Sequence, residues 1–101
     1  MNYTENFEGI KIDVQTVDLT ISEELQQKIR DMIKRLQRHI SEINWVDVHF
    51  KKESSQSTDM KTVSARLGIP GNDAFASDSG NHWSELLKNV EEKLRRQLRK
   101  R

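Results

Sequence analysis

Basic side chains are concentrated at the C-terminal end of this 101-residue chain. Between Lys88 and Arg101 there are seven basic and two acidic residues, a net charge of +5, whereas the remaining 87 residues carry ten basic and fourteen acidic residues, a net charge of −4. A dense cationic segment is typical of proteins that bind a polyanion. Cations that complement a helix dipole are the alternative, but two or three would suffice for that. The six basic residues from Lys93 to Arg101, with no acidic residue among them, therefore favour nucleic acid as the partner.

Helical spacing predicts where these cations point. At about 100° per residue, Lys93, Arg96 and Lys100 lie along one flank of a C-terminal helix. The opposite flank and outer side carry Lys88, Arg95 and Arg99. An earlier helix carries Lys28, Arg35 and His39 along one flank, and Arg30 and Lys34 along the other. If the two helices pack side by side, we expect flanking cations from both to face a common groove, where they could meet successive phosphates.

Other kinds of chemistry find no support in the residues. The three histidines lie in different predicted elements, there is no cysteine, and the four glycines are too scattered for a phosphate loop. We therefore expect no enzyme activity, metal or cofactor. Trp83 falls on an apolar helical stripe and is predicted to lie in the core. Trp45 falls on the outer phase of a strand, where edge packing is favoured over a role as a stacking surface for a base.

Length and composition favour a single small domain. Apolar residues make up 34% of the chain and charged residues 33%, and no apolar run approaches the ~20 residues of a membrane helix. The first nine residues are polar and lack the order of a signal peptide. We expect a cytoplasmic protein with a flexible N-terminal arm over residues 1–9 and one domain over residues 10–101.

Alternating and helical patterns define six elements. Strands are predicted at 10–15, 45–51, 63–69 and 74–77, and helices from Ser22 to about Ser41 and from Asn81, the expected N-cap, onwards. Residues 53–59 form a polar loop, and Pro70 begins a turn. The order β-α-β-β-β-α predicts an α+β fold, with two helices on one face of a four-stranded sheet and the other face left to water.

These residues resemble the ribosome hibernation-promoting factor and protein Y family, also known as sigma-54 modulation proteins. The likeness covers about residues 10–101. It rests on the segments 21–25 with 35–36, 43–51, and 76–80 with 93–100, of which Lys93-Leu94-Arg95-Arg96-Gln97-Leu98 is the most specific. The segment 82–88 departs from the family pattern, since it keeps the apolar positions but not the acidic and tyrosine positions. The chain is similar to short members, which lack a further C-terminal domain that pairs ribosomes.

The resemblance implies a fold similar in outline to double-stranded-RNA-binding domains. It also implies binding to the rRNA of the small ribosomal subunit, in the channel for mRNA and tRNA, and inhibition of translation under stress or in stationary phase. The basic residues that face rRNA in the family correspond here to Arg35, Lys93, Arg96 and Lys100, with Lys28 and Arg99 as additions.

Two functions of different classes remain open from the sequence. The first is an RNA-binding inhibitor of translation that acts by occupancy, as a monomer. The second is a regulatory protein-interaction module, or a homodimer, that uses the exposed sheet face or an edge strand. The first predicts steep salt dependence of binding, and the second predicts little.

Overall fold

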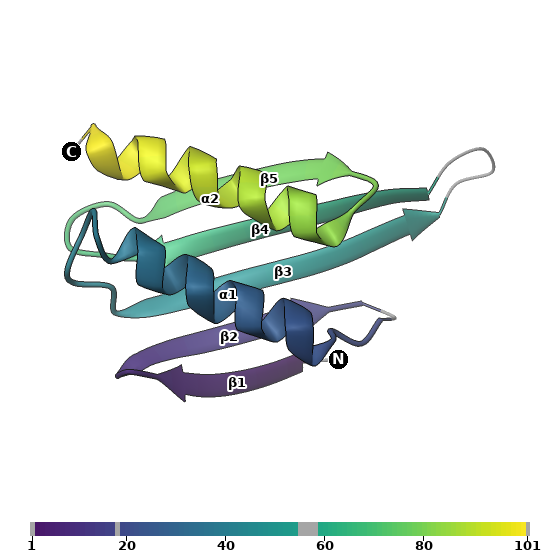
Figure 1. The fold of residues 1–101 in the computed structure, drawn as a ribbon, viewed down its shortest axis with the longest axis horizontal. Coiled ribbons are helices and arrows are strands. Elements are labelled where there is room, and N and C mark those ends of the chain that lie inside the picture. The colour runs from purple at the N-terminus through teal and green to yellow at the C-terminus, as the bar shows by residue number, and fades with distance from the viewer. Residues whose placement is uncertain (1, 18, 55–58, 101) are drawn as a thin grey trace.

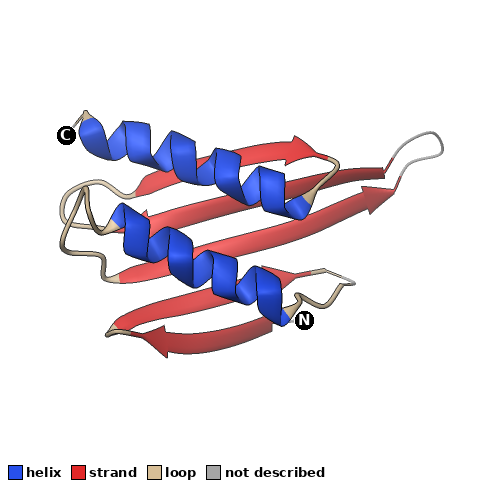
Figure 2. Cartoon of the chain, viewed as in Figure 1, coloured by secondary structure: helices blue, strands red, loops and turns tan. Residues whose placement is uncertain are grey.

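The computed structural model describes residues 2–17, 19–54 and 59–100. They form a single sheet with two helices on one of its faces (Figures 1 and 2). The elements along the chain are β1 (Asn2–Phe7), β2 (Ile10–Thr16), α1 (Glu23–Leu36), β3 (Trp45–Ser54), β4 (Asp59–Gly68), β5 (Ala74–Gly80) and α2 (Trp83–Arg99). The α+β fold with two helices on one sheet face is therefore confirmed.

The five strands lie in chain order across the sheet. Strands β2 and β3 are parallel, and α1 is the crossover that joins them, because a parallel pair cannot be closed by a tight turn. All the other neighbouring pairs are antiparallel. Both helices consequently run in the same direction, so their C-terminal ends lie at the same end of the molecule (Figure 1).

Strand β1 corrects two predictions made from the sequence. Residues 2–7 are not a loose arm but an antiparallel strand paired with β2, and the sheet has five strands rather than four. The turn is closed by Glu8 (φ 52°) and Gly9 (φ 84°), both in the left-handed region that two-residue hairpins favour. Tyr3 and Phe7 pack against the core, and Arg30 on α1 donates to the Glu5 carboxylate at 2.9 Å.

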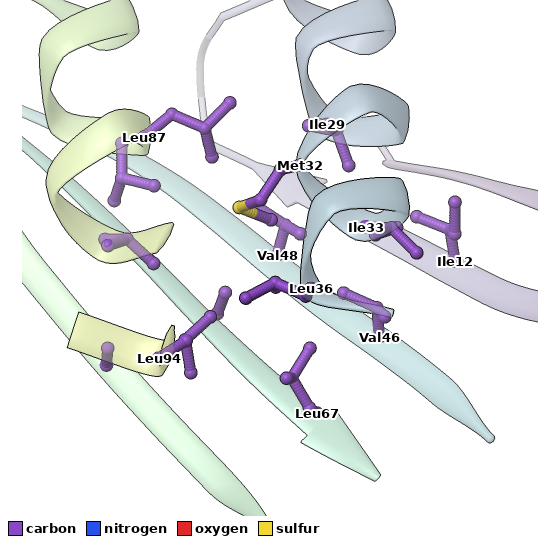
Figure 3. Close-up of a cluster of buried hydrophobic side chains, with 14 of the residues drawn as sticks. Ile12, Ile29, Met32, Ile33, Leu36, Val46, Val48, Leu67, Leu87 and Leu94 are labelled. Atoms are coloured by element: carbon purple, nitrogen blue, oxygen red, sulfur yellow. The ribbon is translucent and has the colours of Figure 1, made fainter. Parts of the chain in front are cut away.

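The core lies between the helices and the sheet. The apolar residues at alternate positions of β2 to β5 meet the stripes of both helices, as Figure 3 shows for Met32, Leu36 and Leu94. The buried helix residues are those that the spacing predicts: Leu25, Ile29, Met32, Ile33 and Leu36 on α1, and Leu86, Leu87, Val90, Leu94 and Leu98 on α2. None of the helices in the described part of the chain is long and apolar enough to cross a membrane.

The helix boundaries differ in part from the prediction. Ser22 caps α1 by accepting a hydrogen bond from the Leu25 amide at 3.1 Å, but the helix ends at Leu36 rather than near Ser41. The N-cap of α2 is His82, without a side-chain capping bond, rather than Asn81. Strands β4 and β5 are longer than expected, and part of the polar loop predicted at 53–59 lies outside the described residues.

We call the sheet face that carries no helix the outer face. The strand register and burial assign to it the alternate residues Asn2, Thr4, Asn6, Lys11, Asp13, Gln15, Trp45, Asp47, His49, Lys51, Glu53, Met60, Thr62, Ser64, Arg66, Gly68, Phe75, Ser77 and Ser79.

Candidate nucleic-acid interface

A groove of about 500 Å³ runs between the two helices. Three basic side chains line it: Lys28 and Arg35 from α1, and Lys88 from α2. Three carboxylates of α2 line it as well, namely Glu85, Glu91 and Glu92. The groove therefore has mixed charge, and its cations do not form the uninterrupted phosphate track that helical spacing suggested.

Arg35 is held by a carboxylate inside this groove. Its Nε donates to one carboxylate oxygen of Glu91 at 2.8 Å, and its Nη2 donates to the other at 2.7 Å. This bidentate ion pair joins α1 to α2. The hydrogen bond to Glu91, followed by the charge of that carboxylate, raises the pKa of Arg35 above its usual value. An RNA phosphate that approaches Arg35 must therefore compete with Glu91.

Lys93 lies on the side of α2 that faces β5, away from α1. Its Nζ donates to the Ser77 carbonyl at 2.7 Å and lies 3.5 Å from the Asp78 carboxylate. One turn further along the same flank, the Gln97 amide both accepts from the Phe75 N–H and donates to the Phe75 carbonyl. This flank secures α2 to the edge strand, so the expectation that Lys93 faces a groove shared with α1 is wrong.

Basic side chains of both helices meet where the helices end. A hollow of about 160 Å³ is lined by Arg35 at the end of α1, by Arg38 and His39 just after it, and by Arg95 from α2. Leu36 and the carboxylates of Glu91 and Glu92 complete its lining. Arg96, Arg99 and Lys100 are exposed on the last turn of α2 and just beyond it. We call the following six residues the basic helix ends: Arg35, Arg38, Arg95, Arg96, Arg99 and Lys100.

The basic helix ends contain two residues that sequence reasoning had not selected for RNA binding, Arg38 and Arg95. Arg38 follows the end of α1, and Arg95 was assigned to the flank opposite Lys93. The signal that could have found them is the parallel course of the two helices, because it brings both C-terminal ends together (Figure 1).

Pairing within the basic helix ends is uneven. Arg95 donates to Glu92, which lowers the pKa of that carboxyl below its usual value, and Arg96 lies 3.8 Å from the same carboxylate. In contrast, the side chains of Arg38, Arg99 and Lys100 form no hydrogen bond or ion pair with the described residues. These three cations are available to an external anion.

The two tryptophans have different environments. Trp83 is partly buried and packs edge-on against Phe50, with ring centroids 5.5 Å apart, which agrees with its predicted place on the apolar stripe. Trp45 lies on the outer face at the start of the central strand β3, not at a sheet edge. Its indole covers Gly68 on β4 so closely that a Cβ there would come within 2.1 Å of the ring.

Comparison with known proteins identifies the family. Residues 12–101 match the sequence profile of the sigma 54 modulation protein / S30EA ribosomal protein family. The chain belongs to this family. A ribosome hibernation promoting factor from Acinetobacter guillouiae is 26% identical over 97 residues, which cover 90% of this chain and 86% of that protein. The family prediction made from the sequence is thus confirmed.

Two solved structures have the same fold as this family member. A ribosomal subunit interface protein from Coxiella burnetii superposes with a TM-score of 0.75 at 22% identity, covering 88% of this chain and 93% of the other. The N-terminal domain of Thermus thermophilus protein Y gives a TM-score of 0.74 at 13% identity, covering 95% and 98%. At these identities the likeness establishes the fold alone.

Proposed function

We propose that this protein binds the rRNA of the small ribosomal subunit, in the channel that mRNA and tRNA use, and inhibits translation by occupying it. The observation that carries the proposal is the gathering of the basic helix ends at one end of the molecule. It is supported by the +5 charge of the last fourteen residues and by the names of the family and of its relatives. Such a protein works in the cytoplasm under stress or in stationary phase, and it turns over no substrate.

The electrostatics suit a phosphate backbone. Long cationic side chains from two helices can meet several phosphates at once, and each contact releases counterions. Of the residues predicted from the family, Arg96, Arg99 and Lys100 belong to this surface without a structural bond to the sheet. Arg35 and Lys28 would contribute from the groove. Lys93 would contribute only after giving up its bonds to β5.

Co-sedimentation with purified small subunits tests the surface. We expect the wild-type protein to pellet with the subunits and the double variant Arg96→Glu/Arg99→Glu to lose most of this binding. The matched control is Lys11→Glu/Lys52→Glu, which reverses two exposed charges on β2 and β3 that are not among the basic helix ends. Equal loss in both variants, or binding retained in the first, would contradict the proposed surface.

Competition tests the channel. If the protein blocks by occupancy, subunits preloaded with mRNA and tRNA should bind it much more weakly than empty subunits. Inhibition of translation in a purified system should then saturate at about one protein per subunit. Undiminished binding to loaded subunits would show that the protein sits elsewhere on the particle.

A further inference from the structure

The outer face of the sheet carries a polar depression that the function above does not use. Its volume is about 230 Å³, and it is lined by Asp47 and His49 of β3, Ser64 and Arg66 of β4, and Phe75 of β5. Cross-strand pairing fixes these residues: Asp47 lies opposite Arg66, Arg66 opposite Phe75, and His49 opposite Ser64. The small Ser64 side chain among larger neighbours explains the hollow, which β-strands hold in place.

One side of the depression is a flat cationic and aromatic surface. The Arg66 guanidinium lies over the Phe75 ring, 4.8 Å from its centroid, and Phe75 is 44% exposed. Unstacked RNA bases pack on such aromatic rings and guanidinium planes. The volume is about eight times the ~30 Å³ that one water takes up in the liquid, which leaves room for one heterocyclic base.

The Asp47 carboxylate supplies a hydrogen-bonding edge next to this surface. It forms no hydrogen bond or ion pair with the described residues, although it lies opposite Arg66 across the β3–β4 ladder. An ionised carboxylate only accepts hydrogen bonds, and it can accept two side by side. Among the RNA bases, guanine alone presents an imino N–H beside an exocyclic amine on its Watson–Crick edge. We propose that this depression binds an unpaired guanine of single-stranded RNA.

The surroundings favour a strand of RNA over a free nucleotide. A second hollow of about 380 Å³ shares His49 and Ser64 with the depression and continues past Lys51 and Thr62 to Gln15 on β2. A single strand with its guanine in the first hollow can therefore cross the sheet. A phosphate of that strand would lie beside Lys51, whose Nζ is 2.8 Å from the Glu53 carboxylate, and would compete with it. This site lies on the face opposite the helices, so it does not depend on the function proposed above.

Titration of the ¹⁵N-labelled protein with short RNAs, followed by NMR, tests the site. The probes are UUGUU, UUAUU and UUIUU, in which inosine lacks only the exocyclic amine of guanine. We expect UUGUU to shift the amide signals of β3, β4 and β5 around the depression and to bind about tenfold more tightly than the other two. Equal affinities for guanine and inosine, or shifts confined to the helices, would overturn the proposal.

Two variants with matched controls locate the contacts. Asp47→Asn should abolish the preference for guanine over inosine. Glu53→Gln, the analogous change further along β3, releases Lys51 but should leave the preference for guanine intact. Phe75→Ala should weaken UUGUU binding about tenfold, whereas Met60→Ala, an equally exposed apolar residue of the outer face, should not. If GMP bound as tightly as UUGUU, the site would recognise a free nucleotide, and the proposal that it binds an RNA strand would be overturned. Concentration-dependent shifts of the outer face without RNA would instead indicate self-association and overturn it too.

Discussion

Arg35 illustrates how a single neighbour changes the role of a basic residue. Its type and position suit phosphate binding, yet Nε and Nη2 of its guanidinium both donate to the Glu91 carboxylate on the other helix. This ion pair is half exposed on the arginine side, so its contribution to stability is about 1 kcal/mol or less. Glu91 thus contributes little to the fold and mainly sets how readily Arg35 can leave for an anion.

Replacement of Glu91 with glutamine should therefore tighten RNA binding. We expect the affinity for small subunits to rise about two- to fivefold, because Arg35 is released and a like charge leaves the groove. The unfolding free energy should fall by about 1 kcal/mol at most. Binding assays on Glu91→Gln are compared with Glu85→Gln, which removes a charge from the same groove without breaking an ion pair. The same gain in both variants would mean that the Arg35–Glu91 bond is irrelevant.

A second prediction at the level of single residues concerns Tyr3, which is the only tyrosine of the chain. Burial, with a smaller effect of the Glu5 charge, raises the pKa of Tyr3 to about 12. The folded state thus holds the phenol proton more tightly than the unfolded state, where the pKa is about 10. The stabilisation is complete below pH 10 and is lost as the pH rises towards 12.

Tyrosinate absorbance at 295 nm should accordingly titrate with a midpoint near pH 12 in the folded protein. The Tyr3 hydroxyl is buried without a partner among the described residues. Tyr3→Phe should therefore be neutral or stabilising by up to about 1 kcal/mol at pH 7 and should flatten the loss of stability between pH 10 and 12. A midpoint near pH 10 would mean that the phenol is solvated.

At the scale of elements, periodicity predicted both helices and four strands but missed β1. The residues of β1 are mostly polar, and its inward side is carried by Tyr3, Glu5 and Phe7, of which Glu5 needs Arg30 as a partner. That partner lies 25 residues away, so no local pattern reveals the strand. Similarly, helical phase grouped Lys93 with Arg96 and Lys100, but it could not tell that β5, and not α1, lies beside Lys93.

Removal of β1 tests its contribution to the fold. Deletion of residues 1–8 exposes the apolar surface under Tyr3 and Phe7 and leaves Arg30 without its carboxylate. We expect a loss of about 2–4 kcal/mol in unfolding free energy, measured by urea denaturation, and a fall in Tm of about 10 °C or more. Glu5→Gln, which removes only the charge partner, should cost about 1 kcal/mol or less. An unchanged urea midpoint in the truncated protein would restore the view of residues 1–9 as a loose arm.

At the scale of the whole molecule, the residues that hold the fold together lie on different surfaces from the exposed cations and the polar hollows. The buried helix faces and the β5-facing flank of α2 hold the fold together. The ends of both helices carry cations, of which Arg38, Arg99 and Lys100 have no side-chain partner among the described residues, and the outer sheet face carries polar hollows. Because the two helices run parallel, a chain with a formal net charge of only +1 presents a strongly basic end.

The salt dependence of ribosome binding measures how many cations of this basic end contact phosphates. If the six basic helix ends each meet a phosphate, a plot of log K against log salt concentration should fall with a slope of about −4 to −5, since each contact contributes about −0.7 to −0.9. Arg96→Glu/Arg99→Glu should reduce the steepness by about two, because two contacts are lost. Lys11→Glu/Lys52→Glu should leave it unchanged. A nearly flat plot for the wild-type protein would instead favour a protein partner, because binding through an apolar or hydrogen-bonded interface releases few counterions.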